Sequence, residues 1–123
     1  MKQRPTNLNF LTIHFPITAW VSILHRLSGF YVFLCIPILL WVLQESLASE
    51  ERLSALKNTF SGPLFTSILW LLAAAFIYHL VAGIRHLLMD VHIGESKAGG
   101  RRGAWLVLII SFLLLISAGY FYG

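Results

Sequence analysis

Charged side chains are scarce in this sequence. Only 11% of the 123 residues are Asp, Glu, Lys or Arg, whereas soluble domains carry about 25%. Cysteine is nearly absent as well, and the single Cys35 excludes both a disulfide framework and a metal site built from cysteines. No short apolar segment ends in a small-residue cleavage site, so we expect no secretory signal peptide. A soluble catalytic domain is therefore not expected in this chain.

What the sequence has instead is long apolar runs without charge. Such runs cover 18 residues between Arg26 and Glu45, 27 between Lys57 and Arg85, and 21 after Arg102. About 20 mostly apolar residues cross the hydrocarbon core of a bilayer as a helix, and a helix satisfies its own backbone hydrogen bonds in lipid. We therefore predict an all-α protein with three transmembrane helices. We expect one membrane domain over residues 1–123, with an arm at 1–18 and spans at about 19–43, 63–91 and 104–122.

The segments outside these spans are short. Residues 45–62 read as a polar connection with a short amphipathic turn at 50–56, and Gly94 to Gly103 read as a loop. Pro37 lies inside the first span, where a membrane helix tolerates it with a kink. Pro63 suits the first turn of the second helix. Nothing left over is long enough to fold alone.

The distribution of Lys and Arg predicts the orientation. Cytoplasmic segments carry the excess of basic residues, and acidic residues count little. The arm and the second loop hold five basic residues, and the first loop holds two: Lys2, Arg4, Lys97, Arg101 and Arg102 against Arg52 and Lys57. We expect a cytoplasmic N-terminus, a C-terminus outside, and a bacterial cytoplasmic (inner) membrane, since no transit segment precedes the arm. Membrane lipid is an expected partner; nucleic acid is not, because no basic stripe exists beyond the membrane edge.

Ionisable groups within a span are costly in lipid and are by default functional hypotheses. The first cluster is Ser22, His25 and Arg26, which fall on one arc of the first helix, with Gly29 on the same stripe. These groups could bind a carboxylate or donate hydrogen bonds to a carbonyl oxygen. The alternative is that Arg26 extends to the lipid headgroups and Ser22 serves helix packing.

The second cluster is on the second helix. His79, Gly83, His86 and Asp90 share one helical face, and His79 lies deepest in the membrane. A neutral imidazole there suits a haem iron, and small neighbours would let a flat macrocycle approach the backbone. Alternatively, His79 hydrogen-bonds to another helix, and His86 with Asp90 forms an ordinary i,i+4 pair.

The antiparallel course of the two helices places both clusters in the cytoplasmic half of the membrane. Arg26, Arg85, His25 and His86 could therefore converge on one anionic ligand, such as haem propionates. His79 and His86 cannot both ligate one iron, because they lie on the same face of one helix. A sixth ligand from His25 or His14 is conceivable, but a histidine of a second membrane subunit fits better. The chain therefore resembles half of a two-subunit helical bundle.

The sequence resembles the cytochrome b membrane anchor subunit (the C subunit) of succinate dehydrogenase, or complex II, over nearly its whole length. The resemblance is carried by Arg4-Pro5, Phe15-Pro16-Ile17-Thr18, the segment Ser22-Ile-Leu-His25-Arg26-Leu-Ser28-Gly29, and the segment Tyr78-His79-Leu-Val-Ala-Gly83-Ile-Arg85-His86-Leu-Leu-Met-Asp90. Two positions depart from the family pattern, Phe10 and His92, and neither is a candidate ligand.

The resemblance implies roles for the matching residues. His79 would be the axial ligand of haem b, shared with a histidine of a second membrane anchor subunit. Ser22 and Arg26 would line the ubiquinone site, and His25, Arg26 and His86 would surround the haem propionates. The chain would anchor a flavoprotein subunit and an iron–sulfur subunit and would itself hold no catalytic residue for succinate. Alternatives are the anchor of a quinol:fumarate reductase and a non-redox small membrane subunit.

Overall fold

The computed structural model describes residues 16–122, which form four α-helices in the order α1 (Ile17–Ala48), α2 (Glu50–Phe60), α3 (Pro63–Asp90) and α4 (Lys97–Tyr122). No strand occurs within this range, so the predicted all-α class is confirmed. The helices α1, α3 and α4 are long and apolar enough to cross a membrane. The protein is thus a multi-pass membrane protein.

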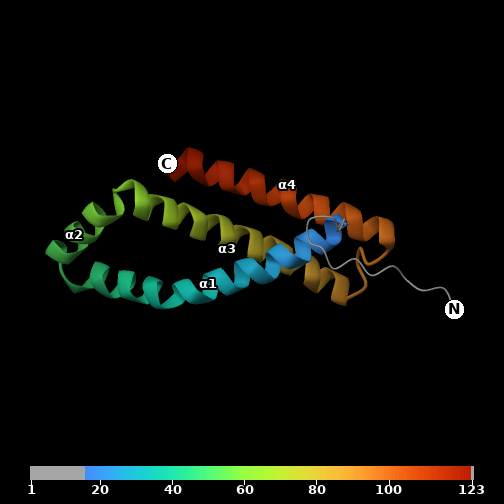
Figure 1. The fold of residues 1–123 in the computed structure, drawn as a ribbon, viewed down its shortest axis with the longest axis horizontal. Coiled ribbons are helices and arrows are strands. Elements are labelled where there is room, and N and C mark those ends of the chain that lie inside the picture. The colour runs from blue at the N-terminus through green and yellow to red at the C-terminus, as the bar shows by residue number, and fades with distance from the viewer. Residues whose placement is uncertain (1–15, 123) are drawn as a thin grey trace, which may run out of the picture.

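The three long helices run antiparallel in sequence order (Figure 1). Helices α1 and α3 cross near the end where α1 begins and separate toward the end where the short α2 joins them. Helix α4 starts beside the first turns of α1 and returns along α3. The first turns of α1, the last turns of α3 and the first turns of α4 therefore meet at one end of the bundle.

Helix α2 is longer than the turn expected from the sequence. Ser49 caps it, because its hydroxyl accepts a hydrogen bond from the backbone N–H of Arg52 at 3.1 Å. Glu50 and Glu51 occupy its first turn and Lys57 its last turn, which complements the helix dipole at both ends. These local signals extend the helix over all 11 residues to Phe60.

Helix α4 begins at Lys97, inside the segment that the sequence predicts as a loop, and the predicted span at 104–122 is its C-terminal part. Ser96 starts the helix: its hydroxyl accepts a hydrogen bond from the backbone N–H of Gly99 at 3.0 Å. Two glycines of this segment lie against other helices. Gly100 is buried near Thr18 of α1, and Gly103 faces Arg85 of α3.

The buried core is small and lies where the three long helices meet. Val21, Ala82, Ala104 and Val107 form it, all at most 3% exposed. Small side chains at these positions allow the helix backbones to approach closely, as is typical of membrane helices. Large apolar side chains point outward elsewhere, so the rest of the surface suits hydrocarbon or another membrane subunit.

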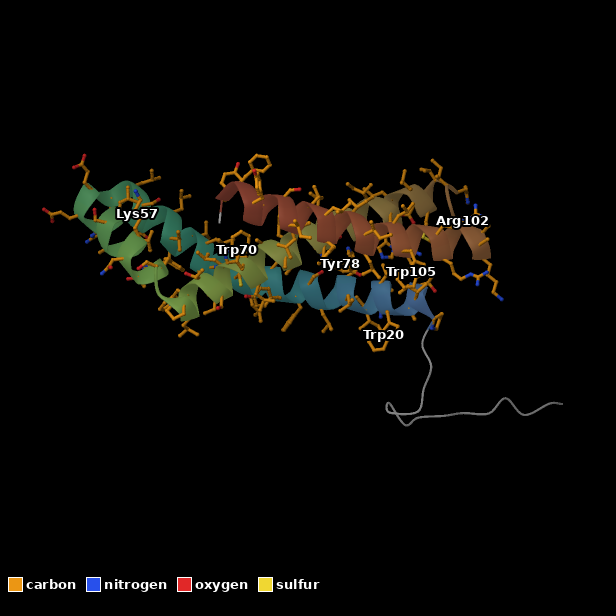
Figure 2. All side chains as sticks on the ribbon, turned by 90° about the horizontal axis from the view of Figure 1, so that it is seen from above. Trp20, Lys57, Trp70, Tyr78, Arg102 and Trp105 are labelled. Carbon is orange, nitrogen blue, oxygen red and sulfur yellow. The ribbon has the colours of Figure 1, made fainter. Side chains whose placement is uncertain are left out.

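The polar ends of the molecule are distinguished by their side chains. Figure 2 shows Arg102, Trp20 and Trp105 at one end and Lys57 at the other. Tryptophan is enriched where a membrane meets water. The end that carries Arg101 and Arg102 is also the end of the first candidate cluster, as the sequence predicts.

Candidate functional site

The imidazole of His79 lies between α3 and α1, directly against Gly29. A Cβ atom placed on Gly29 would stand 2.7 Å from Cε1 and 3.2 Å from Nδ1 of His79. No side chain fits into that space, so the absence of one at Gly29 is what admits the ring. The space beside Gly29 is thus filled by His79 in this structure.

One ring nitrogen of His79 is engaged by α1. Its Nδ1 lies 3.1 Å from the backbone oxygen of His25 and 3.1 Å from Oγ of Ser28. The Ser28 hydroxyl itself donates to the same His25 oxygen at 2.8 Å. Both neighbours of Nδ1 are therefore acceptors, which favours a proton on Nδ1 and leaves the lone pair on Nε2.

Three imidazoles from two helices gather here. The rings of His25 and His79 stack with centroids 4.2 Å apart and planes 5° apart, and the ring of His86 lies 4.8 Å from that of His25. Gly83 of α3 faces the same ring, since a Cβ atom there would be in van der Waals contact with Nε2 of His25 at 3.6 Å. The sequence-predicted residues His25, His79 and His86 are thus brought together.

The donor set suits a group that brings most of its own ligands. Within residues 16–122 no three His, Cys, Asp or Glu side chains are arranged to hold a metal ion. Haem iron needs only axial ligands from protein, and His79 has an Nε2 lone pair and a fixed ring. The residues therefore fit haem. His25 does not fit as the sixth ligand, because stacked parallel rings cannot face each other across one iron; His14 lies outside the described residues.

Ser22 and Arg26 lie one helical turn apart on α1, at the end where the basic residues gather. Ser22 is half-buried, whereas Arg26 is exposed. At 1.5 Å per residue, Ser22 is roughly 10 Å along α1 from Gly29, where His79 docks. Ser22 and Arg26 of α1 are therefore near the point where His79 of α3 contacts that helix.

Arg85 does not join the cluster of imidazoles, contrary to the expected convergence of four residues on one anion. Its side chain is buried between α3 and α4, and its Nη2 donates to the backbone oxygen of Gly100 at 3.3 Å. Gly103 makes room for it, since a Cβ atom there would be 3.2 Å from Nε. Arg85 thus joins two helices, a role that helix geometry alone could not assign.

Two residues of the site were not predicted from the sequence. Ser28 has no assigned role there, although it lies three residues after His25 and next to Gly29. Tyr78 lies beside His79, and its hydroxyl donates to the backbone oxygen of Val21, which ties α3 to α1. The position of Ser28 next to Gly29, where the helices cross, is a sequence feature that could have indicated its role. The sequence contains no comparable feature for Tyr78.

Comparison with known proteins identifies the family to which this membrane bundle belongs. Residues 1–118 match the family described as the succinate dehydrogenase/fumarate reductase transmembrane subunit. The chain belongs to this family. The resemblance noted from the motifs is thereby confirmed.

Relatives in this family are similar over nearly their full length. The succinate dehydrogenase cytochrome b556 subunit of Coxiella burnetii is 40% identical over 119 residues, covering 95% of this chain and 94% of that protein. The subunit of the same name from Rickettsia bellii is 35% identical, with 93% and 89% covered. The cytochrome b560 subunit of Reclinomonas americana is 31% identical, with 94% and 83% covered.

Proposed function

We propose that this chain is the membrane-anchoring cytochrome b subunit of a succinate:quinone oxidoreductase. It holds one side of a haem b, contributes to a ubiquinone site, and attaches the soluble flavoprotein and iron–sulfur subunits to the membrane. It takes part in an enzyme complex without holding the catalytic residues for succinate. The names of the relatives from Coxiella and Rickettsia support both the activity and the haem.

The observation that carries the proposal is how the imidazole of His79 is hydrogen-bonded and held in place. Its Nδ1 is engaged by two acceptors of α1, at 3.1 Å each, and its ring is fixed against Gly29. Ligating histidines nearly always donate their second ring N–H to a carbonyl, carboxylate or water, which fixes the ring and the tautomer. The hydrogen bonds at Nδ1 thus give His79 the fixed ring and tautomer of a ligating histidine.

When bound, haem b supplies a one-electron redox centre within the membrane. His79 would hold it through Nε2, together with a histidine of a second anchor subunit. His25 stands beside His79, His86 lies beside His25, and Arg26 is next in sequence to His25, which suits contact with the anionic propionates. The other face of the site belongs to the partner, which also covers part of the apolar surface of α1 and α3.

Ser22 and Arg26 hold the quinone. An Arg guanidinium and a hydroxyl donate hydrogen bonds to a quinone carbonyl, and the charge on Arg26 stabilises the negative charge that develops on that oxygen during reduction. Succinate oxidation releases two electrons and two protons, and reduction of the quinone to quinol consumes two of each. Both residues lie near the basic end, which supports a quinone site at the proposed cytoplasmic face, where the soluble subunits would bind.

The deciding experiment is a reduced-minus-oxidised visible spectrum of the complex purified natively through this chain. We expect a b-type haem signal that is lost in His79→Ala. His92→Ala is the matched control, because His92 is an exposed histidine of the loop after α3 and leaves the signal intact. A complex without a b-type haem signal contradicts the proposal and favours a non-redox anchor. A normal signal in His79→Ala contradicts the assignment of His79 as the ligand.

A further inference from the structure

We propose that Ser28 is a positioning residue for His79, and that it fixes the ring so that Nε2 is the nitrogen presented to iron. This inference rests on the proposed function, because it assumes that His79 binds haem. It assigns a role to a side chain that touches neither iron nor quinone. Ser28 acts only through the imidazole.

The contacts of Ser28 are specific and buried. The residue is 8% exposed, at the crossing of α1 and α3. Its hydroxyl donates to the His25 oxygen at 2.8 Å, and its Oγ lies 3.1 Å from Nδ1 of His79. The serine thus links the backbone of α1 to the imidazole of α3.

The number of protons available among Ser28 Oγ, the His25 oxygen and His79 Nδ1 determines the tautomer of His79. A serine hydroxyl has one proton, and here it points to the His25 carbonyl, which has none to give. If Nδ1 carried a lone pair instead of a proton, it would face two oxygen atoms at 3.1 Å without a hydrogen between them. Nδ1–H is therefore favoured, and Nε2 keeps the lone pair that iron requires.

The rest of the packing restricts movement of the ring but does not select its tautomer. His25 stacks on one face of His79, and Gly29 contacts its edge. A ring flipped by 180° would keep its stack and its volume. It would lose the two hydrogen bonds at Nδ1, so Ser28 and the His25 carbonyl are what distinguish the two orientations.

A second serine of α1 provides a matched comparison. The hydroxyl of Ser46 donates to the Leu43 oxygen at 2.8 Å, the same bond to the residue three positions earlier that Ser28 makes. Ser46 lies at the far end of α1, and its hydroxyl bonds to no histidine within residues 16–122. Removing either hydroxyl therefore costs the same local bond, and only Ser28 removes a contact with His79.

The test uses the purified complex and measures how fast haem leaves it for excess apomyoglobin. Loss of a residue that orients a metal ligand typically weakens binding about 10- to 100-fold. We expect Ser28→Ala and Ser28→Cys to lose haem about tenfold faster than the wild type, while Ser46→Ala matches the wild type. Ser28→Thr keeps the hydroxyl and is expected to retain haem.

Ser28→Ala and Ser28→Cys are both needed, because one variant can still be measured if the other fails to assemble. Cysteine has nearly the size of serine but is a weak donor and acceptor, so Ser28→Cys tests the hydrogen bond even where Ser28→Ala fails to assemble. Equal haem loss from Ser28→Cys, Ser46→Ala and the wild type overturns the inference. Low-temperature EPR of the ferric haem adds a second readout: a changed ring orientation shifts the largest g value in Ser28→Cys but not in Ser46→Ala.

The outcome also separates this inference from the proposed function. If His79→Ala retains haem, the ligand assignment itself is wrong. If His79→Ala loses haem while Ser28→Cys holds it as firmly as the wild type, only the role of Ser28 is wrong.

Discussion

His79 and Gly29 are in contact so close that any side chain on Gly29 would overlap the imidazole. The Cβ atom of an alanine there would stand 2.7 Å from Cε1 of His79. The approach of α3 to α1 therefore depends on a missing methyl group. The position of the ring depends on it too.

We predict that Gly29→Ala displaces His79 and lowers the haem content of the complex. Overpacking of this kind costs about 1–3 kcal/mol, since the ring or the helices must move. Haem per complex, measured as the pyridine haemochrome, checks this. Gly119→Ala is the control, because a Cβ atom there meets nothing within 4 Å; equal haem in both variants would show that the site has room to spare.

Arg26→Leu is expected to abolish most quinone reduction while succinate oxidation by an artificial dye continues. Removing one group that stabilises developing charge typically costs about 10²–10³ in rate, and the flavoprotein does not need this residue. Both activities are measured on the same preparation. Arg52→Leu, at the opposite end of the bundle, should leave both unchanged. A similar quinone rate in Arg26→Leu and Arg52→Leu would mean that Arg26 only contacts headgroups.

Labelling of single cysteines tests the proposed orientation. In a Cys35→Ser background, Asn58→Cys places a thiol in α2 and Lys97→Cys places one at the start of α4, at opposite ends of the bundle. We expect a membrane-impermeant maleimide to label Asn58→Cys in intact spheroplasts, and Lys97→Cys only after lysis, because basic loops stay in the cytoplasm. The reverse pattern would invert the topology and move the candidate quinone site to the outer face.

Arg85 is expected to contribute to stability through α4. Its guanidinium donates to the Gly100 oxygen at 3.3 Å, and hydrogen bonds of charged groups contribute about 1.5–3 kcal/mol. Arg85→Ala should therefore lower the midpoint of thermal denaturation of the detergent-solubilised complex, with Arg101→Ala, an exposed arginine, as control. No difference between the two would mean that other contacts hold α4 in place.

The turn after α3 offers a pair of opposite substitutions. His92 has a φ of 65° and Gly94 a φ of 71°, and a side chain in this region costs roughly 1–2 kcal/mol. Gly94→Ala should destabilise the complex by about that amount. His92→Gly should stabilise it slightly, because the exposed His92–Glu95 pair at 2.9 Å offsets at most about 1 kcal/mol. Destabilisation by His92→Gly would show that the pair holds the turn.

The sequence was sufficient for the elements with strong one-dimensional signals. Long uncharged runs give α1, α3 and most of α4, and the motifs around His25 and His79 identify the family, because both depend only on order and spacing. The early start of α4 could not be predicted, since its glycines are tolerated only by the neighbours they face. The direction of Arg85 depends on the same neighbours. The roles of Ser22, Arg26, His25, His79 and His86 stay predictions.

The small core has a consequence for how this sequence can change over generations. Positions such as Phe33 and Leu40, more than 60% exposed, are constrained by hydrocarbon or a partner's surface, and another large apolar residue serves equally well where lipid is the neighbour. Val21, Ala82 and Ala104 are constrained by shape, because the helices touch there. Homologues should therefore exchange apolar residues freely along the outer faces and conserve size at these few crossings. Substitution rates along one helix should then vary with a helical period.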